Sequence, residues 1–251
     1  MADADAVIPS SVTPTPDPAA PGEMSLVDHL VELRDRLIRI VLCVAVASIV
    51  GFLFGDQIVA ALKAPLPSDK PLFFTGIGDA FTIKLKIAIV VGIIISMPVI
   101  LYQVWGFVSP GLTADERRIV RPWLPLALVF FVIGTVIAYV ILPFAAGFLI
   151  AFQSPDLQAL ITAGSYFDFV TTMFLAFGLI MEFPILLFGL SRVGIVTSKR
   201  LTGARRMIIL GISIFAVAIT PGGDLVSPTV LGLTMYALFE GTVFFIRRTG
   251  K

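Results

Sequence analysis

Charged residues are scarce in this chain of 251 residues: they make up 14% of the sequence, whereas 57% is hydrophobic. Soluble domains of ordinary composition carry about 25% charged residues. Mean hydropathy is +1.00, and several apolar runs reach the length of about 20 residues that crosses a bilayer. The shortage of charge excludes an ordinary soluble domain and predicts an integral membrane protein with several spans.

Cysteine and histidine occur once each, as Cys43 and His29. A single cysteine excludes an intramolecular disulfide, and so few ligands argue against a metal site, so neither a metal nor a cofactor is expected. A net charge of +1 provides no basic field for nucleic acid. The sequence contains no zinc-protease motif, no nucleophile elbow and no glycine-rich phosphate loop, which favours a protein that is not an enzyme.

Six apolar stretches predict an all-α protein with six transmembrane helices. They cover about 37–54, 81–108, 122–143, 166–191, 207–220 and 228–246. The last two are short and form a hairpin, and Pro143 is expected to end or bend the third. The long connection at 55–79 is expected to have some structure of its own. The composition of residues 1–24 predicts a disordered tail, which leaves a membrane domain at 25–248 and a short end at 249–251.

Lysine and arginine are distributed unevenly between the two sides of these spans. Segments 25–39, 109–121, 192–206 and 247–251 lie on one side and hold 14 of the 18. The cytoplasmic loops of membrane proteins carry the excess of positive charge. We therefore expect both termini in the cytoplasm and the protein in the inner membrane of the cell.

The stretch from Phe169 to Ser191 combines an apolar span with one acidic residue, Glu182, and Pro184 follows it. A carboxylate at that depth costs at least about 2.5 kcal/mol on insertion scales, so Glu182 is expected to face protein or a wet cavity. Proline lacks the N–H that would bond to the carbonyl of Ile180, so the helix is expected to bend there. A functional role is the default for such a residue, and a protonated, hydrogen-bonded structural glutamate is the alternative.

Glu32 and Glu116 lie near the predicted cytoplasmic face, and each has two interpretations. Glu32 has the spacing of an exposed i,i+4 pair with Arg36, and Glu116 that of a capping-box acid with Thr113. Both could instead bind a cationic partner, because a carboxylate can accept two parallel hydrogen bonds from a guanidinium.

Two acids near the last span have structural interpretations. Glu240 is expected to reach the interface or to pair with Arg247 or Arg248. Asp224 could cap the sixth helix, while Ser227 and Pro228 have the pattern of an N-cap followed by proline at the first helical position.

Five motifs, in their order along the chain, resemble the TatC family, the multispanning receptor of the twin-arginine protein translocase. They are HLVELRDRL at 29–37, MPVILYQVWGFVSPGL at 97–112, ERR at 116–118, FGLIMEFP at 177–184 and TPGGD at 220–224. The resemblance covers about residues 24–248. It implies a concave, glove-like bundle of six helices that binds the twin-arginine signal peptides of folded cargo at its cytoplasmic face.

The resemblance also implies roles for single residues. The family's signal-binding positions correspond to Glu32, Glu116, Arg34, Arg118 and Phe107. Glu182 matches a buried glutamate that faces the concave pocket. Structural or partner-docking roles are considered for Pro65, Asp224, Ser227, Thr229 and Glu240.

The partners that the family implies are twin-arginine signal peptides, TatA-like single-span proteins, TatB-like ones in lineages that have them, other TatC copies and membrane lipid. Transport would be driven by the proton motive force. The chain departs from the family near the start of the last span, where many members have a polar Gln for partner docking and this sequence has Ser227-Pro228-Thr229. Ser227 or Thr229 is the candidate substitute.

A second function is compatible with the residues alone, namely a proton-coupled small-molecule transporter in which Glu182 carries the proton. Such transporters are often built from inverted repeats, and no repeat is visible in the sequence. The receptor interpretation is therefore preferred.

Overall fold

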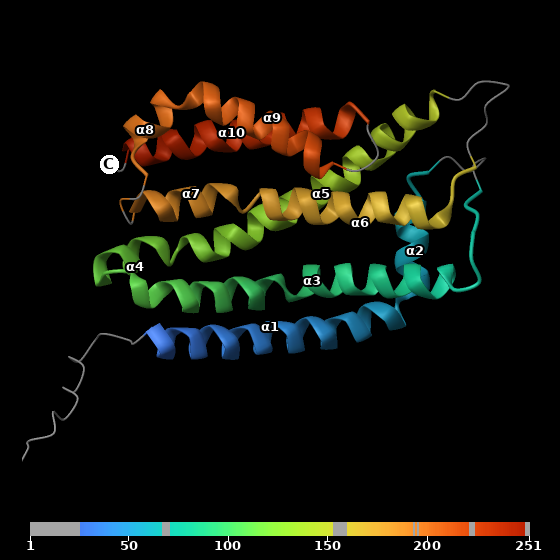
Figure 1. Cartoon of the computed structure of the whole chain (residues 1–251), viewed down its shortest axis with the longest axis horizontal. Helices are drawn as coiled ribbons and strands as arrows, with labels where there is room; N and C mark the ends of the chain where they lie inside the picture. The colour runs from blue at the N-terminus through green and yellow to red at the C-terminus, as the bar shows by residue number, and fades with distance from the viewer. Residues whose placement is uncertain are drawn as a thin grey trace, which may run out of the picture.

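The computed structural model describes residues 26–66, 71–152, 160–192, 194, 196–220 and 224–248, which are mainly helical (Figure 1). Within this part of the chain, β pairing is limited to one isolated bridge between Phe73 and Thr162. The predicted all-α class is confirmed. The predictions for residues 1–24 and 249–251 lie outside the described residues.

Long helices occupy the positions of the predicted spans. They are α1 (Leu26–Leu53), α3 (Asp79–Val108), α5 (Trp123–Ile150), α6 (Ala163–Ile180) followed by α7 (Phe183–Arg192), α9 (Arg205–Ile219) and α10 (Val226–Arg248). Five of these segments are long and apolar enough to cross a membrane. The remaining one, α9, has 15 residues, or about 22 Å of helix. Helices α9 and α10 form the hairpin that the sequence predicts, but only α9 is short, since α10 has 23 residues.

Shorter elements connect the spans. They are α2 (Gly55–Lys63), the 3₁₀ turn η1 (Ser109–Gly111), α4 (Ala114–Val120) and α8 (Ser198–Gly203). Helix α2 is the structure expected within segment 55–79. Of the two outcomes expected at Pro143, an end or a bend of the third span, the end is excluded, because α5 continues to Ile150. Proline removes one backbone donor, and in lipid the neighbouring backbone groups have no water to replace their helical bonds, so the helix continues.

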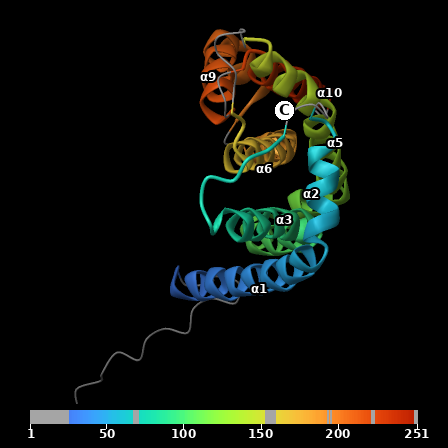
Figure 2. The same ribbon diagram turned by 90° about the vertical axis from the view of Figure 1, so that its right-hand side faces the viewer.

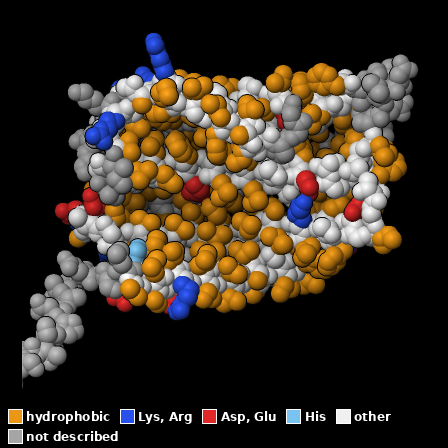
Figure 3. Space-filling model, in the orientation of Figure 1, with side chains coloured by type: hydrophobic (Ala, Val, Ile, Leu, Met, Phe, Trp, Pro, Cys, Tyr) orange, Lys and Arg blue, Asp and Glu red, His pale blue; other side chains and the backbone are white. Residues whose placement is uncertain are grey.

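Seen along its helices, the bundle is an arc that is open on one side (Figure 2). Helix α1 lies at one end of the arc and α9 at the other, with α3 and α6 between them. Along the arc α1 packs on α3, α5 packs on α6, and α9 packs on α10. The open face is hollowed and lined mostly by hydrophobic side chains (Figure 3). The predicted concave bundle is confirmed.

The main core lies where α3, α5 and α6 meet. Phe177 and Met173 of α6 are fully buried, and Ile87 of α3 and Leu142 of α5 belong to the same cluster. Many outward-facing side chains are also large and hydrophobic. A surface of this kind suits contact with lipid, in which apolar side chains need no burial inside the protein.

Small residues let α1 and α3 approach closely. A Cβ atom on Gly92 would overlap Ser48, and one on Gly51 would lie 3.1 Å from the carbonyl oxygen of Ala88. Helices in membranes associate through such small residues, because lipid provides no hydrophobic driving force between them. We call Ser48, Gly51, Ala88 and Gly92 the glycine seam, and it holds α1 against α3.

Polar contacts join distant segments at the end of the bundle opposite the start of α1. They are the hydrogen bond from Ala163 N–H to the Phe73 carbonyl at 2.7 Å, the Lys86–Asp168 ion pair at 2.5 Å, and the hydrogen bond from the Tyr166 hydroxyl to the Leu62 carbonyl at 2.8 Å. These contacts hold α2, α3 and α6 together at this end of the bundle.

Replacing Gly92 with alanine should lower the free energy of unfolding by about 1–3 kcal/mol, because the added methyl group would overlap Ser48. Gly211→Ala is the matched control: a Cβ atom there meets nothing within 4 Å, and alanine favours a helix over glycine. Graded unfolding in SDS of both purified variants measures the difference. If Gly92→Ala were as stable as Gly211→Ala, the close packing of α1 on α3 would be refuted.

Candidate functional site

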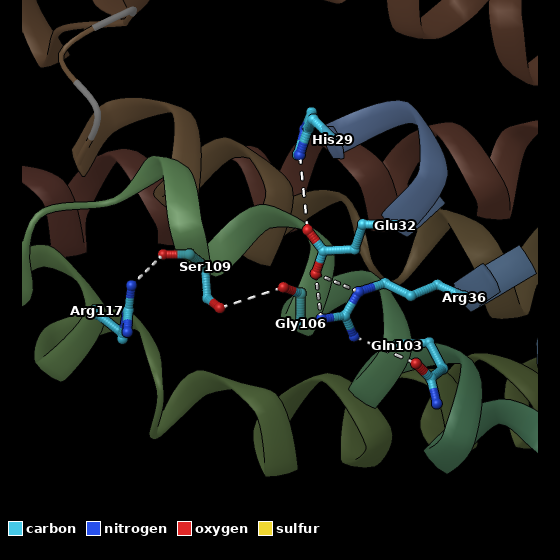
Figure 4. A network of polar contacts seen from close by, with 7 residues as sticks. All are labelled: His29, Glu32, Arg36, Gln103, Gly106, Ser109 and Arg117. Carbon is cyan, nitrogen blue, oxygen red and sulfur yellow. Dashed lines mark hydrogen bonds and ion pairs between the residues drawn. The ribbon is translucent and has the colours of Figure 1, made fainter. Parts of the chain in front are cut away.

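The start of α1 and the end of α3 meet at one end of the bundle, where Glu32 and Arg36 lie one helical turn apart (Figure 4). Nε and Nη2 of Arg36 donate to the same carboxylate oxygen, Oε1 of Glu32, at 2.9 and 2.5 Å. Each of the two side chains is only 20% exposed. The i,i+4 pair expected from the sequence is present, and it is more buried than an ordinary surface pair.

Helix α3 forms the surface on which the Arg36 guanidinium lies. Nη1 of Arg36 donates to Oε1 of Gln103 at 3.3 Å. A Cβ atom on Gly106 would overlap Nη1, so the missing side chain leaves the space that the guanidinium fills. Gln103 and Gly106 are three residues apart and share one face of the helix. The guanidinium is therefore held by α1 on one side and by α3 on the other.

The second oxygen of Glu32 has a different environment. Oε2 is buried and has no hydrogen-bond partner among the described residues. Nδ1 of His29 lies 3.7 Å from it, and the His29 ring stacks on Phe107 of α3 with ring centroids 4.3 Å apart. We call His29, Glu32, Arg36, Gln103 and Phe107 the Glu32 cluster. It contains a carboxylate with one bonded oxygen and one unused acceptor, next to an aromatic pair.

Glu116 lies on α4, beyond η1. Its Oε2 accepts the Thr113 N–H at 3.0 Å, and the Glu116 N–H donates to Thr113 Oγ1 at 3.4 Å, so the capping box is formed. Nη2 of Arg117 donates to the Ser109 carbonyl at 2.9 Å, and the Ser109 hydroxyl donates to the Gly106 carbonyl at 3.3 Å. These bonds connect α4 to the end of α3 (Figure 4).

The two arginines implied by the family resemblance lie on the exposed surface. The guanidinium of Arg34 pairs with the neighbouring Asp35 at 2.8 Å, and the Arg34 side chain is 67% exposed. Arg118 is exposed on α4, where it lines a surface depression of about 470 Å³ with Arg117 and Arg121. Of the candidate residues, the structure brings Phe107 into the Glu32 cluster and leaves Arg34 and Arg118 facing outward.

The helix that carries Glu182 is interrupted, as the proline predicts. Helix α6 ends at Ile180, Met181 and Glu182 form a turn, and α7 begins at Phe183. Oε1 of Glu182 is buried without a hydrogen-bond partner in the described part of the chain. Figure 3 shows an acidic side chain among hydrophobic ones in the hollow, close to where α6 gives way to α7. A carboxyl group in this position can hold a proton or accept a hydrogen bond from a second molecule.

The start of α10 is held by Asp224, which is buried and accepts the Ser227 N–H at 2.5 Å. Because α10 begins one residue before Ser227, that residue lies inside the first turn and is not the N-cap suggested by the sequence. Its hydroxyl contacts the Met173 sulfur of α6 at 3.6 Å. The hydroxyl of Thr229 donates to the Leu225 carbonyl of its own segment at 2.6 Å.

Glu240 pairs with α9. Its Oε2 accepts from Nη2 of Arg205 at 2.7 Å, and its Oε1 accepts from the Tyr236 hydroxyl at 3.2 Å. The expected pair with Arg247 or Arg248 is therefore wrong. Arg247 lies about 10 Å further along the same helix, whereas the packing of α9 on α10 brings Arg205 alongside.

Pro65 lies just beyond α2 and is half-buried. The N–H of the next residue, Leu66, donates to the Lys63 carbonyl at 2.9 Å, and the Leu66 side chain belongs to the main core. The chain after α2 is thus anchored in the core, which fits a structural role for this proline.

Three residues that the sequence did not single out contact candidate acids or their partners. Gln103 and Gly106 lie in the motif at 97–112, and their three-residue spacing on one helix face is the signal that could have identified them. Arg205 had no comparable signal, because its contact with Glu240 depends on how α9 and α10 are rotated.

Residues 28–233 match the family model for Sec-independent protein translocase protein (TatC). A TatC protein of Frankia casuarinae is 38% identical over 232 residues, which cover 86% of this chain and 64% of that protein. A TatC protein of Azotobacter chroococcum is 36% identical over 236 residues, which cover 92% of each. The fold is similar to the crystal structure of the twin-arginine translocase receptor TatC in DDM, with a TM-score of 0.76 and 30% identity over 87% of this chain and 99% of that one.

Replacing Asp224 with alanine should destabilise the start of α10 by about 1 kcal/mol, because the Ser227 N–H would lose its carboxylate acceptor. Hydrogen–deuterium exchange across residues 224–232 measures this effect. Thr229→Ala is the control, since that hydroxyl bonds to a carbonyl one turn earlier and makes no cap. Equal exchange in the two variants would contradict the capping role of Asp224.

Proposed function

Because this chain belongs to the TatC family of Sec-independent protein translocase proteins, we propose that it is the receptor that binds twin-arginine signal peptides in a translocase. The observation that carries this proposal is the Glu32 cluster, where a half-buried carboxylate already binds a guanidinium. An arginine of a signal peptide has the same chemistry. Membership of this family also favours protein translocation over small-molecule transport, and receptor function requires no catalytic residues.

We further propose that the Glu32 cluster faces the cytoplasmic side of the inner membrane, with both termini in the cytoplasm. Support comes from the distribution of lysine and arginine, since 14 of the 18 lie on the side of the start of α1 and the end of α10. Signal peptides meet the receptor from the cytoplasm, so this orientation exposes the candidate binding site to its ligand.

Glu32 and Glu116 are the proposed acceptors for the two signal arginines. Both lie at the end of the bundle where α1, α3 and α4 meet, and the Arg117–Ser109 bond joins the helix of Glu116 to the helix that supports Glu32. Phe107, stacked on His29, would contact apolar parts of the peptide. Arg34 and Arg118, which are exposed, would contact peptide carbonyls or acidic side chains around the motif.

Other surfaces are proposed to bind the remaining components. Glu182 would form an intramembrane polar pocket in the hollow face, supported by its buried, unpartnered oxygen. Thr229, which lines an apolar groove between α9 and α10, would take the place of the Gln of other family members in docking single-span TatA-like or TatB-like partners. Pro65, Asp224 and Ser227 would support these surfaces structurally. Transport would be driven by the proton motive force, with other copies of the receptor in the assembly.

Site-specific photocrosslinking in membranes tests the receptor assignment. Photoreactive residues in place of Val31 and Asp115 leave Glu32 and Glu116 intact, and one in place of Ile77, exposed at the opposite end, is the control. Peptides carrying Arg-Arg or Lys-Lys would be compared. Crosslinks at the first two positions with Arg-Arg alone are expected, whereas equal crosslinks with both peptides would show general charge attraction only.

The double variant Glu32→Ala with Glu116→Ala should lose at least about tenfold in affinity for a twin-arginine peptide, because charge-assisted hydrogen bonds are among the stronger polar contacts. The control variant, Asp35→Ala with Asp115→Ala, removes the same charge from the same two helices and should lose far less. Binding to the receptor in nanodiscs measures both. If the first variant were present at normal abundance and still bound the peptide, other residues would have to recognise the twin-arginine motif.

Replacing Glu182 with alanine should impair transport or partner docking more than initial signal binding, because Glu182 lies at the helix break between α6 and α7, away from the Glu32 cluster. Peptide affinity and transport into membrane vesicles would be measured on the same preparation. A loss of peptide affinity as large as the loss of transport would show that the pocket is misplaced.

A further inference from the structure

Glu32 is already occupied by an arginine of the receptor itself. Oε1 accepts two N–H groups of Arg36, which uses the two acceptor positions of that oxygen. Oε2 is buried. A cation arriving from water therefore finds neither oxygen open unless a side chain of the receptor moves first.

The surroundings of Arg36 are suited to a guanidinium. Its three bonded nitrogens reach two acceptors, Glu32 on α1 and Gln103 on α3. Nη1 lies where a side chain at position 106 would be, so Gly106 makes room for the group. A lysine ammonium is a compact point charge and cannot span two separated acceptors in this way.

We propose that Arg36 lowers the affinity of the site by occupying Glu32 in the unliganded receptor, so that a ligand arginine must exchange with it. This proposal rests on the receptor function proposed above and adds the state of the site before binding. An incoming guanidinium replaces the bonds that Arg36 gives up, because it presents the same donors in the same plane. An incoming ammonium replaces fewer of them, but displacing Arg36 costs either ligand the same free energy, so the exchange weakens the binding of both.

Arg36 acts here as an internal competitor, which differs from a purely structural partner of Glu32. A structural partner would make binding weaker when removed, since Glu32 would lose its orientation. A competitor would make the binding of either peptide stronger when removed, by the same factor. The direction of the change separates the two roles.

The test uses the full chain in nanodiscs and labelled synthetic signal peptides that carry Arg-Arg or Lys-Lys. Arg36→Gln should bind the Arg-Arg peptide about fivefold more tightly, the change expected from removing one partly buried competing pair. The Lys-Lys peptide should gain by the same factor, so the dissociation constants of the two peptides should keep the same ratio. Arg39→Gln removes the same charge from the same helix and should change either affinity by less than about twofold.

Gly106→Ala tests the same exchange without altering Arg36. The new methyl group would overlap Nη1 and displace the flexible end of Arg36 from Gln103 and Glu32, so affinity should again rise. A thermal unfolding curve shows whether Arg36→Gln folds. If it does not, Gly106→Ala alone tests whether Arg36 competes with the peptide for Glu32.

The outcomes separate the two proposals. Unchanged or weaker Arg-Arg binding in the folded variants would overturn the exchange and leave the receptor function standing. Failure of the wild-type protein to bind the Arg-Arg peptide would overturn the receptor function itself. Tighter binding of both peptides in either variant, but not in Arg39→Gln, supports the exchange.

Discussion

Lipid offers no water to a charged or polar group, so every such group within the spans depends on a partner in the protein. The Lys86–Asp168 and Arg205–Glu240 pairs each join two helices. Pairing these charged groups therefore also helps to determine which helices lie next to each other. Glu182 differs from them, because its Oε1 is buried with no hydrogen-bond partner in the described residues. Oε2 of Glu32 and Oδ2 of Asp224 share this condition, but the other oxygen of each of those two carboxylates accepts a hydrogen bond.

The site at the end of the bundle depends on the packing of α1 on α3. Glu32 and Arg36 come from α1, whereas Gln103, Gly106 and Phe107 come from α3, and the glycine seam holds these helices together several turns away. Without that close approach the guanidinium of Arg36 would lie in solvent, and the pair would be an ordinary surface ion pair of small energy. Residues far from any ligand thus give the carboxylate its half-buried environment.

Hydropathy and charge distribution predicted the number of spans, and the proline after Glu182 predicted the helix break, because both features follow from local sequence and the thickness of a bilayer. The partner of Glu240 could not be predicted. A span that is apolar on all sides has no periodic stripe to show which face meets the next helix, so the rotation of α10 that brings Glu240 to Arg205 is set by tertiary packing. Gly106 was missed for a related reason, since its importance lies in the space it leaves for another helix.

The glycine seam has a thermodynamic consequence for recognition. Helices held backbone to backbone lose their relative freedom when the protein folds, and this ordering is complete before any ligand arrives. Binding to a site built across such a contact then loses conformational entropy mainly from the ligand and from the few side chains that exchange partners. The receptor surface is in this sense preorganised, and a flexible peptide contributes most of the disorder that association removes.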